Sequence, residues 1–318
     1  MSSKIYMVIP CYNEEAVLAE TTKRLTEKFG ALIGSGAVSP DSRVVYVDDG
    51  SRDKTWALIE EIHRENPLVR GVKLSRNRGH QNALLAGLLT VKAEADAVIS
   101  MDADLQDDID AIDAMVAKYN EGADIVYGVR SKRATDSFFK RATAEGFYKV
   151  MHGLGAKVVY NHADYRLMSR RALDALEEFG EVNLFLRGIV TLIGYKTDIV
   201  YYERSERFAG ESKYPLKKML SFAWDGITSF SDKPLQIIVG LGMFVCFASL
   251  VGLIYCLVRW LTGNTVAGWT SMTMLILLLG GIQLLSLGVI GQYIGKIYSE
   301  TKRRPRFIVE TYLDGSER

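Results

Sequence analysis

The segment Val98-Ile-Ser-Met-Asp-Ala-Asp-Leu-Gln106 begins as an apolar run and ends in a polar turn that carries two aspartates. Similar apolar runs that end in turn residues recur at residues 5–9, 44–47, 72–74 and 125–127. Stretches with helical periodicity lie between them, at residues 16–29, 54–65, 82–92 and 109–119. This alternation predicts an α/β domain with a mostly parallel sheet. The interruption at residues 30–41 is interpreted as a surface loop.

Polar clusters follow these apolar runs directly. Ligands of such sheets bind beyond the carboxyl ends of the strands. We therefore expect a ligand site built from four clusters, namely Cys11-Tyr-Asn-Glu-Glu15, Asp48-Asp-Gly-Ser51, Ser75-Arg-Asn-Arg-Gly-His80 and Asp102-Ala-Asp-Leu-Gln106.

The composition excludes several classes of protein. The 318 residues carry a formal net charge of +1, which argues against a nucleic-acid partner, because proteins that bind the phosphate backbone show a basic excess. The three cysteines have neither the spacing of a metal site nor that of a disulfide framework, so a reducing, cytosolic location fits the polar part of the chain. The apolar run near the N-terminus is too short for a signal peptide and is interpreted as a first strand.

Two long uncharged segments lie at residues 235–258 and 269–294. Each is long enough to cross a hydrocarbon core, which takes about 20 apolar residues. Six basic residues lie between Arg204 and Lys233 and five between Lys296 and Arg306, whereas the connecting loop has only Arg259. The positive-inside rule therefore predicts that the large domain and both termini are cytoplasmic. Glycines in both segments would let them pack with each other or in a homo-oligomer.

Basic amphipathic patterns with large aromatic residues occur at residues 137–154 and 214–230. They are typical of helices at a membrane surface, although core-facing helices of the globular domain would show the same pattern. The predicted organisation is a cytosolic α/β domain over residues 1–213, a juxtamembrane amphipathic helix over 214–232, two transmembrane helices within 233–298 and a cytosolic tail over 299–318.

Asp102 and Asp104 stand two residues apart at the end of a predicted strand, so both carboxylates can face one hard cation such as Mg²⁺ or Mn²⁺. Such a cation bridges the phosphate oxygens of a nucleoside diphosphate and neutralises it as a leaving group. A solvated acidic turn before a helix would have the same sequence, and Asp48 with Asp49 would serve equally as a helix cap. The aspartates taken alone leave these alternatives open.

Together with Pro10-Cys-Tyr-Asn-Glu14, the two acidic turns resemble the family 2 glycosyltransferases of GT-A fold, in which these motifs occur in this order and spacing. The resemblance implies that Asp104, with Asp102 and Gln106, holds Mg²⁺ or Mn²⁺ on the diphosphate of the donor. It also implies a nucleotide-sugar site made of Pro10, Tyr12, Asn13, Glu14, Asp48, Asp49, Ser51, Arg76, Asp102 and Ala103.

Within that family the chain resembles the polyprenyl-phosphate glycosyltransferases, the bactoprenol glucosyltransferase and dolichol-phosphate mannose synthase type. Further shared pieces are Gly128-Val-Arg130, Asp164-Tyr-Arg-Leu-Met168 and the stretch from Arg207 to Tyr214, together with the paired apolar segments. One departure is Asp107-Asp108-Ile109, where relatives often carry prolines. The likeness implies a UDP-sugar donor and a polyprenyl phosphate acceptor, bound by Arg130, Arg207, Ser212 and Lys213.

General chemistry agrees with such an acceptor. A lipid phosphate is already anionic at pH 7 and needs cations to approach a diphosphate, whereas a sugar hydroxyl would need a carboxylate base. Asp104, Arg130 and Asp164 are the expected catalytic residues. Asp164 is assigned as a base or as an orienter of the acceptor phosphate, with an ion pair to Arg166 as the alternative. His80 is assigned to the phosphate loop.

The sequence therefore predicts an inverting hexosyltransferase of the bacterial inner membrane that transfers glucose from UDP-glucose to undecaprenyl phosphate on the cytoplasmic face. UDP-galactose, UDP-N-acetylglucosamine and GDP-mannose stay open as donors. A processive polysaccharide synthase is rejected, because Cys256-Leu-Val-Arg-Trp260 lacks the glutamine of the Gln-x-x-Arg-Trp motif. A membrane-bound scaffold that binds nucleotide sugars without turnover is disfavoured by the retention of Asp102, Asp104, Arg130 and Lys213.

Overall fold

A computed structural model describes residues 2–131, 162–182, 184–203, 233–262 and 268–315. The chain divides into two compact units. The first comprises Met1–Glu145, Val158–Tyr214 and Arg304–Arg318, and the second comprises Gly146–Lys157 and Pro215–Arg303.

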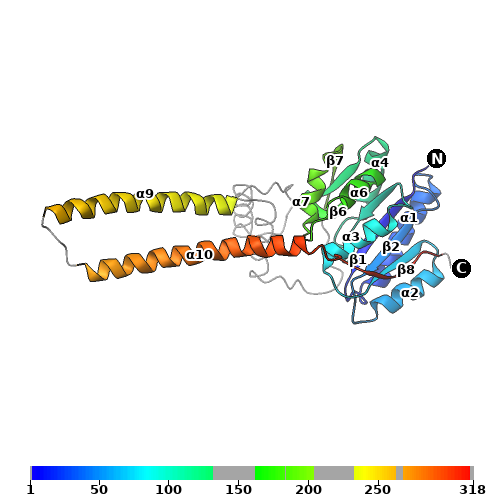
Figure 1. The fold of residues 1–318 in the computed structure, drawn as a ribbon. Coiled ribbons are helices and arrows are strands. Elements are labelled where there is room, and N and C mark those ends of the chain that lie inside the picture. The colour runs from blue at the N-terminus through cyan, green and yellow to red at the C-terminus, as the bar shows by residue number, and fades with distance from the viewer. Residues whose placement is uncertain (1, 132–161, 183, 204–232, 263–267, 316–318) are drawn as a thin grey trace. The chain divides into compact units, whose positions relative to one another are not determined.

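The first unit is built on one eight-stranded sheet (Figure 1). Its strands are β1 (Ile5–Cys11), β2 (Arg43–Asp48), β3 (Val69–Leu74), β4 (Ala97–Ser100), β5 (Ile125–Arg130), β6 (His162–Ser169), β7 (Thr197–Tyr202) and β8 (Val309–Leu313). They lie in the order β7-β5-β6-β4-β1-β2-β3-β8. β1 pairs in parallel with β2 and β4, β2 with β3, and β5 with β7. β6 is antiparallel to β4 and β5, and β8 is antiparallel to β3, so the described sheet is mixed, with four parallel and three antiparallel pairings.

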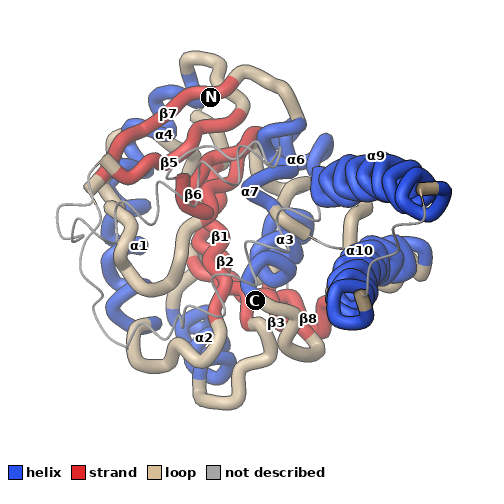
Figure 2. Tube along the Cα trace, turned by 90° about the vertical axis from the view of Figure 1, so that its left-hand side faces the viewer, coloured by secondary structure: helices blue, strands red, loops and turns tan. Residues whose placement is uncertain are grey.

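Helices cover both faces of this sheet, as Figure 2 shows. One face carries α1 (Leu18–Gly34), α2 (Thr55–Glu65) and α4 (Ala111–Asn120). The other carries α3 (His80–Val91), α6 (Arg170–Glu177) and α7 (Leu186–Leu192). Strands covered on both faces are near-continuous apolar runs, and β1 is accordingly buried along its whole length. The carboxyl ends of β1, β2, β3 and β4 are thereby brought to one edge.

The predicted strands and helices between residues 5 and 127 are confirmed, with ends that differ by a few residues. The expected surface loop at residues 30–41 starts later than predicted, because α1 continues to Gly34. Leu32 is buried in the hydrophobic core. Its burial outweighs the cost of glycine in a helix, which is about 1 kcal/mol.

The segment predicted as a separate tail, residues 299–318, contributes β8 to the sheet of the first unit. β8 covers the edge of β3, whose backbone groups would otherwise need other hydrogen-bond partners. Arg70 of β3 donates to the hydroxyl of Tyr312 over 2.8 Å, and its guanidinium lies 5.5 Å from the ring centroid of Tyr6. No pattern in the sequence predicts this short strand, because its position depends on pairing with the free edge of β3.

The second unit contains α9 (Lys233–Leu261) and α10 (Trp269–Thr301). Within them, Pro234–Gly252 with a mean hydropathy of 2.2 and Leu278–Thr301 with a mean hydropathy of 1.4 are long and apolar enough to span a membrane. The helix α9 contains the whole predicted segment 235–258, and α10 contains the whole predicted segment 269–294. The amphipathic segments at residues 137–154 and 214–230 lie outside the described residues.

Gly87 lies where α3 meets the sheet, and a Cβ atom there would stand 2.5 Å from methyl groups of both Val8 and Val47. We expect Gly87→Ala to lower the free energy of unfolding by about 1–3 kcal/mol through overpacking, although alanine is the better helix former. Gly30→Ala is the matched control, because a Cβ at this exposed position of α1 meets open space. It should raise the free energy of unfolding by up to about 1 kcal/mol. Chemical unfolding of the detergent-solubilised chain measures both, and equal effects would contradict this packing.

Candidate active site

A cavity of about 450 Å³ opens at the carboxyl edge of the sheet. Tyr12, Asp48, Ser51 and Arg76 line it, and all of them were predicted to bind the nucleotide sugar. They come from the end of β2 and from the loops after β1, β2 and β3. The remaining lining residues are Gly50, Arg52, Trp56, Lys73, Leu74, Ser75, Asn77 and Glu310.

Hydrogen bonds join the loops that follow β1 and β2. The backbone N–H of Asn13 donates to Ser51 Oγ over 3.0 Å, and the backbone N–H of Arg52 donates to Asn13 Oδ1 over 2.8 Å. The backbone N–H of Glu14 donates to Thr55 Oγ1 over 2.9 Å. Asn13 has a φ of 56°, a conformation that asparagine tolerates better than most residues. The structure therefore gives Asn13 and Ser51 a clear role in shaping the loops around the cavity.

Asp49 lies in different surroundings from those predicted. Its carboxylate is buried and accepts hydrogen bonds from the backbone N–H groups of Arg78 and Gly79, over 2.6 and 2.8 Å. A Cβ on the neighbouring Gly50 would stand 2.6 Å from the backbone nitrogen of Asn77. Asp49 and Gly50 thus hold the loop after β3 against the loop after β2. Asp49 is not among the residues that line the cavity, and its expected contact with the nucleoside stays a prediction.

Pro10 and Ala103 also lie inward. Pro10 is buried within β1, opposite Val47 of β2. Ala103 is 5% exposed, and its carbonyl oxygen accepts a hydrogen bond from Thr21 Oγ1 over 3.0 Å. Both residues support the strand ends on which the polar loops begin.

The loop after β4 presents Asp102 and Asp104. Asp102 Oδ1 is buried and accepts no hydrogen bond from the described residues. Leu105 has a φ of 55°, an unfavourable conformation for its side chain, and the backbone N–H of Gln106 donates to Asp104 Oδ1 over 3.3 Å. The strained turn therefore holds the two acidic positions in place, as local strain often does at functional sites.

The donor set fits a hard divalent cation. Asp102 Oδ1 has no hydrogen-bond partner among the described residues, and Mg²⁺ is commonly held by one or two carboxylates together with phosphate and water oxygens. No group of three or more His, Cys, Asp or Glu side chains is arranged as a metal site within the described part of the chain. A cation at Asp102 and Asp104 would thus take its other ligands from the substrate and from water. Burial raises the pKa of Asp102 to about 6, against the opposing charge of His80.

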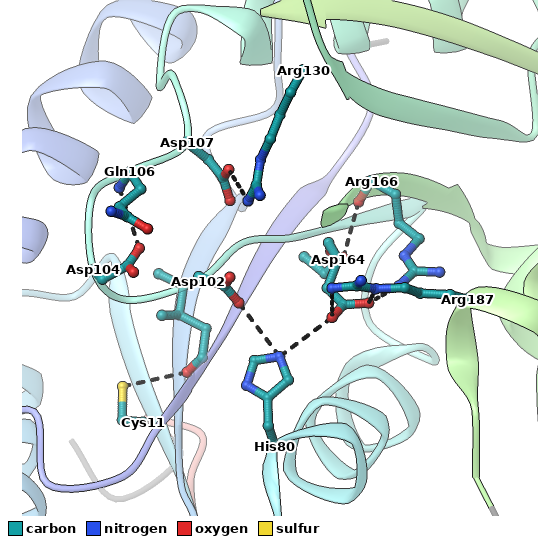
Figure 3. Close-up of polar contacts among 12 residues, drawn as sticks. Cys11, His80, Asp102, Asp104, Gln106, Asp107, Arg130, Asp164, Arg166 and Arg187 are labelled. Atoms are coloured by element: carbon teal, nitrogen blue, oxygen red, sulfur yellow. Dashed lines mark hydrogen bonds and ion pairs between the residues drawn. The ribbon is translucent and has the colours of Figure 1, made fainter. Parts of the chain in front are cut away.

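A charged cluster lies beside Asp102 (Figure 3). His80 Nε2 lies 3.4 Å from Asp102 Oδ1 and 3.7 Å from Asp164 Oδ2. Arg166 Nη2 donates to Asp164 Oδ1 over 2.5 Å, and Arg187 Nη2 donates to Asp164 Oδ2 over 3.1 Å. These side chains come from the start of α3, from β6 and from α7. His80, assigned to the phosphate loop, instead links the acidic loop after β4 to the charged pair on β6.

The surroundings of Asp164 determine how readily it accepts a proton, which bears on its two expected roles. Burial would raise its pKa, but the nearby His80 and the charges of Arg187 and Arg166 hold the pKa of this carboxyl well below its usual range. Such a carboxylate is a weak proton acceptor at neutral pH. The ion pair with Arg166, the alternative from the sequence, is present, and the geometry favours orientation over base catalysis.

Arg130, predicted to bind the acceptor phosphate, stands at the end of β5 and is tied to the acidic loop. Arg130 Nη2 donates to Asp107 Oδ1 over 3.3 Å, and Arg130 Nε donates to the hydroxyl of Tyr202 over 3.2 Å. The Tyr202 hydroxyl donates to the same Asp107 oxygen over 2.5 Å. Asp107 is 3% exposed, so the pair places a cation at the buried margin of the site.

Asp107 and Arg187 were missed as site residues. In the sequence, Asp107 stands out only as part of Asp107-Asp108-Ile109, where relatives often carry prolines. Arg187 is a single cation in the otherwise uncharged helix Leu186–Leu192, and this isolation was the one available signal. Arg207, Ser212 and Lys213 lie outside the described residues, so their roles stay predictions.

Comparison with known proteins identifies the family. The profile described as Glycosyl transferase family 2 matches residues 6–177. The chain belongs to glycosyltransferase family 2. This glycosyltransferase is 54% identical over 307 residues to an uncharacterized glycosyltransferase of Bacillus subtilis (strain 168), YkoT, with 96% of this chain and 91% of that protein covered. It is 40% identical over 311 residues to the bactoprenol glucosyl transferase of Shigella phage SfX, with 97% and 99% covered.

Among solved structures, the glycosyltransferase matches the mannosyltransferase PcManGT from Pyrobaculum calidifontis, in complex with GDP-Man and Mn²⁺, at 16% identity and a TM-score of 0.46. The match covers 94% of this chain and 85% of that one. Family membership confirms the predicted fold class, a GT-A α/β domain, here with a mixed sheet and two apolar C-terminal helices.

We expect Asp104→Asn to weaken Mn²⁺ binding in the presence of UDP by about tenfold or more, because a coordinating carboxylate is lost and even outer partners of a metal contribute that much. Asp110→Asn is the matched control, since the Asp110 side chain is 86% exposed and pairs with Lys28. Electron paramagnetic resonance of free Mn²⁺ in a titration measures both. Wild-type affinity in the Asp104 variant would refute the metal assignment.

Arg166→Met should lower the free energy of unfolding by about 3–5 kcal/mol, because it removes one partner of a buried ion pair. Arg187→Met should lower the free energy of unfolding by a smaller amount, because the Arg187 side chain is 38% exposed and solvent screens its charge. Urea unfolding of the two variants compares them directly. A larger loss in the Arg187 variant would show that Arg187 is the main partner of Asp164.

Proposed function

We propose that this glycosyltransferase transfers glucose from UDP-glucose to undecaprenyl phosphate, giving a lipid-phosphate-linked sugar for modification of a cell-envelope glycan. The observation that carries the proposal is the match to a bactoprenol glucosyl transferase along almost the full length of both chains, including the apolar C-terminal helices. The site supports it, because acidic positions suited to a cation lie beside several arginines.

The acceptor needs no general base in this proposal. A phosphate oxygen of the lipid attacks the anomeric carbon of the sugar, the bond from that carbon to the β-phosphate oxygen breaks, and UDP leaves with its electron pair. Direct displacement inverts the anomeric centre and gives a β-linked product. Mg²⁺ or Mn²⁺ on Asp102, Asp104 and Gln106 would supply charge neutralisation for the departing diphosphate.

The protein's own cations serve the two phosphate groups. Arg130 is held at the margin of the site by Asp107, and Arg187 is held by Asp164, which also lies near His80. A guanidinium that is already oriented by a carboxylate loses little freedom when it binds a phosphate. We assign Arg130 to the acceptor phosphate, together with Arg207, Ser212 and Lys213, and Asp164 to the orientation of Arg187.

The membrane arrangement follows from the basic flanks of the apolar helices. We place the chain in the bacterial inner membrane with two spans, with the catalytic domain and both termini on the cytoplasmic side, where nucleotide sugars are made. Association of chains through the glycine-containing helices is part of this proposal. UDP-galactose, UDP-N-acetylglucosamine and GDP-mannose are the alternative donors, and a binding scaffold without turnover is the alternative of another class.

Purified full-length protein in detergent, supplied with Mg²⁺, undecaprenyl phosphate and a panel of labelled UDP- and GDP-sugars, tests the activity. We expect a labelled lipid product from UDP-glucose, with loss of product when the metal is chelated. A labelled lipid product from another donor, and none from UDP-glucose, would replace glucose with the sugar of that donor in the proposed reaction. Nucleotide binding without a lipid product from any donor would favour the scaffold.

We expect Lys213→Ala to raise the KM for undecaprenyl phosphate by about tenfold while leaving the KM for the donor near its wild-type value, because removal of one charge-assisted phosphate contact costs on the order of 1.5 kcal/mol. Lys23→Ala is the control, since Lys23 is exposed on α1. Steady-state kinetics with each substrate varied in turn separates the two constants. An unchanged acceptor KM would remove Lys213 from the acceptor site.

A further inference from the structure

One ion pair in the cavity at the carboxyl edge joins distant parts of the sequence. Lys73 Nζ lies 3.2 Å from Glu310 Oε1, and both residues line the cavity although they are 237 residues apart. Their side chains are 30% and 48% exposed. An exposed pair of this kind adds less than about 1 kcal/mol to stability, so stability gives little reason for its position.

The backbone fixes where Glu310 stands. Lys73 lies opposite Thr311 and Leu74 opposite Val309, and the register shifts between these two pairs. The backbone N–H of Ser75 donates to the carbonyl oxygen of Ile308 over 3.1 Å. Such irregularities re-aim side chains and are frequent beside functional sites. Glu310 is therefore presented to the cavity by a pinned stretch of strand.

Lys73 is held from a second direction as well. Its ammonium lies 5.6 Å from the centroid of the Trp56 ring, within the range of a cation–π contact. Trp56 is itself oriented, because its indole N–H donates to Glu60 Oε1 over 2.8 Å. The pair thus offers a fixed donor next to a fixed acceptor.

The strand order places this pair at the end of the site away from the acidic loop. β1 and β2 separate β4, which precedes Asp102, from β3, which carries Lys73. A nucleoside diphosphate with its phosphates near Asp102 would extend its nucleoside along this edge toward Lys73. Tyr12 and Trp56 add aromatic surface to the same cavity, which suits the flat face of a nucleobase.

We propose that Lys73 and Glu310 read the edge of the donor's nucleobase and select uracil over cytosine. The inference rests on the proposed function, which supplies the nucleoside diphosphate. An ammonium only donates and a carboxylate only accepts hydrogen bonds, so the pair matches a carbonyl beside a ring N–H, as in O4 and N3–H of uracil. Cytosine places an amino group and an unprotonated nitrogen at these positions, and both contacts then fail.

Sites built to hydrogen-bond a substrate reject analogues strongly, because their own polar groups are left unpaired. Guanine shares the uracil pattern at O6 and N1–H. The pair therefore discriminates against cytidine donors and accepts uridine and guanosine donors. Discrimination between uridine and guanosine is left to the shape of the cavity.

Isothermal titration of the full-length protein in detergent with UDP and with CDP, both with Mg²⁺, tests the inference. The wild type should bind UDP at least about tenfold more tightly than CDP. Glu310→Ala and Lys73→Met should each reduce the ratio of UDP affinity to CDP affinity by about tenfold, mainly by weakening the binding of UDP. Thr311→Ala, the next position on β8, is the matched control and should leave the ratio unchanged.

The ratio separates recognition from a structural role. A Glu310 variant with an unchanged ratio of UDP affinity to CDP affinity, whether or not both nucleotides bind more weakly, would overturn the inference. A wild type that binds neither nucleotide would remove the proposed function and the inference together. The expected change of ratio in a protein that forms no lipid product would sustain the inference and remove the acceptor assignment alone.

Discussion

The ion pairing of Asp164 organises the active site, because a carboxylate at this depth is stable only with cations around it. β6 runs antiparallel between β4 and β5, and Ser100 Oγ of β4 donates to the carbonyl oxygen of Asp164. That insertion brings Asp164 and Arg166 beside the loop that carries Asp102. An isolated buried charge would cost several kcal/mol, so His80, Arg166 and Arg187 have to converge there.

This convergence gives the site charges of both signs at fixed positions. The acidic loop after β4 suits a cation, and Arg187 and Arg130 are each held by a carboxylate at its margin. Both substrates of the proposed reaction carry phosphate, and two anions approach each other only where positive charge is already in place. Groups oriented before the substrates arrive need no rearrangement during the reaction, which is the usual basis of electrostatic catalysis.

The sequence predicted the parts of the fold that depend on local pattern. Strand-helix alternation located β1 to β5 and α1 to α4, and motif order predicted that Tyr12 and Asp48 lie together at the carboxyl edge, where both line the cavity. The parts it missed depend on pairing between distant segments: the antiparallel place of β6, the addition of β8, and the salt bridges of Arg187 and Asp107. Asp49 shows a different limit, because a motif carboxylate that binds a ligand and one that caps a loop have the same sequence. The structure shows the second of these roles for Asp49, which accepts hydrogen bonds from the backbone N–H groups of Arg78 and Gly79.

The pairing of β8 with β3 makes completion of the cavity a late event in synthesis. Lys73 leaves the ribosome 237 residues before Glu310, a delay of roughly 10–50 s at about 5–20 residues per second. During that time β3 is an open sheet edge, which favours unwanted strand pairing. Both apolar helices emerge before β8, so a chain that has not yet made them lacks Glu310 in the lining of the cavity at the carboxyl edge. The order of synthesis thus keeps this cavity incomplete until the two apolar helices have been made.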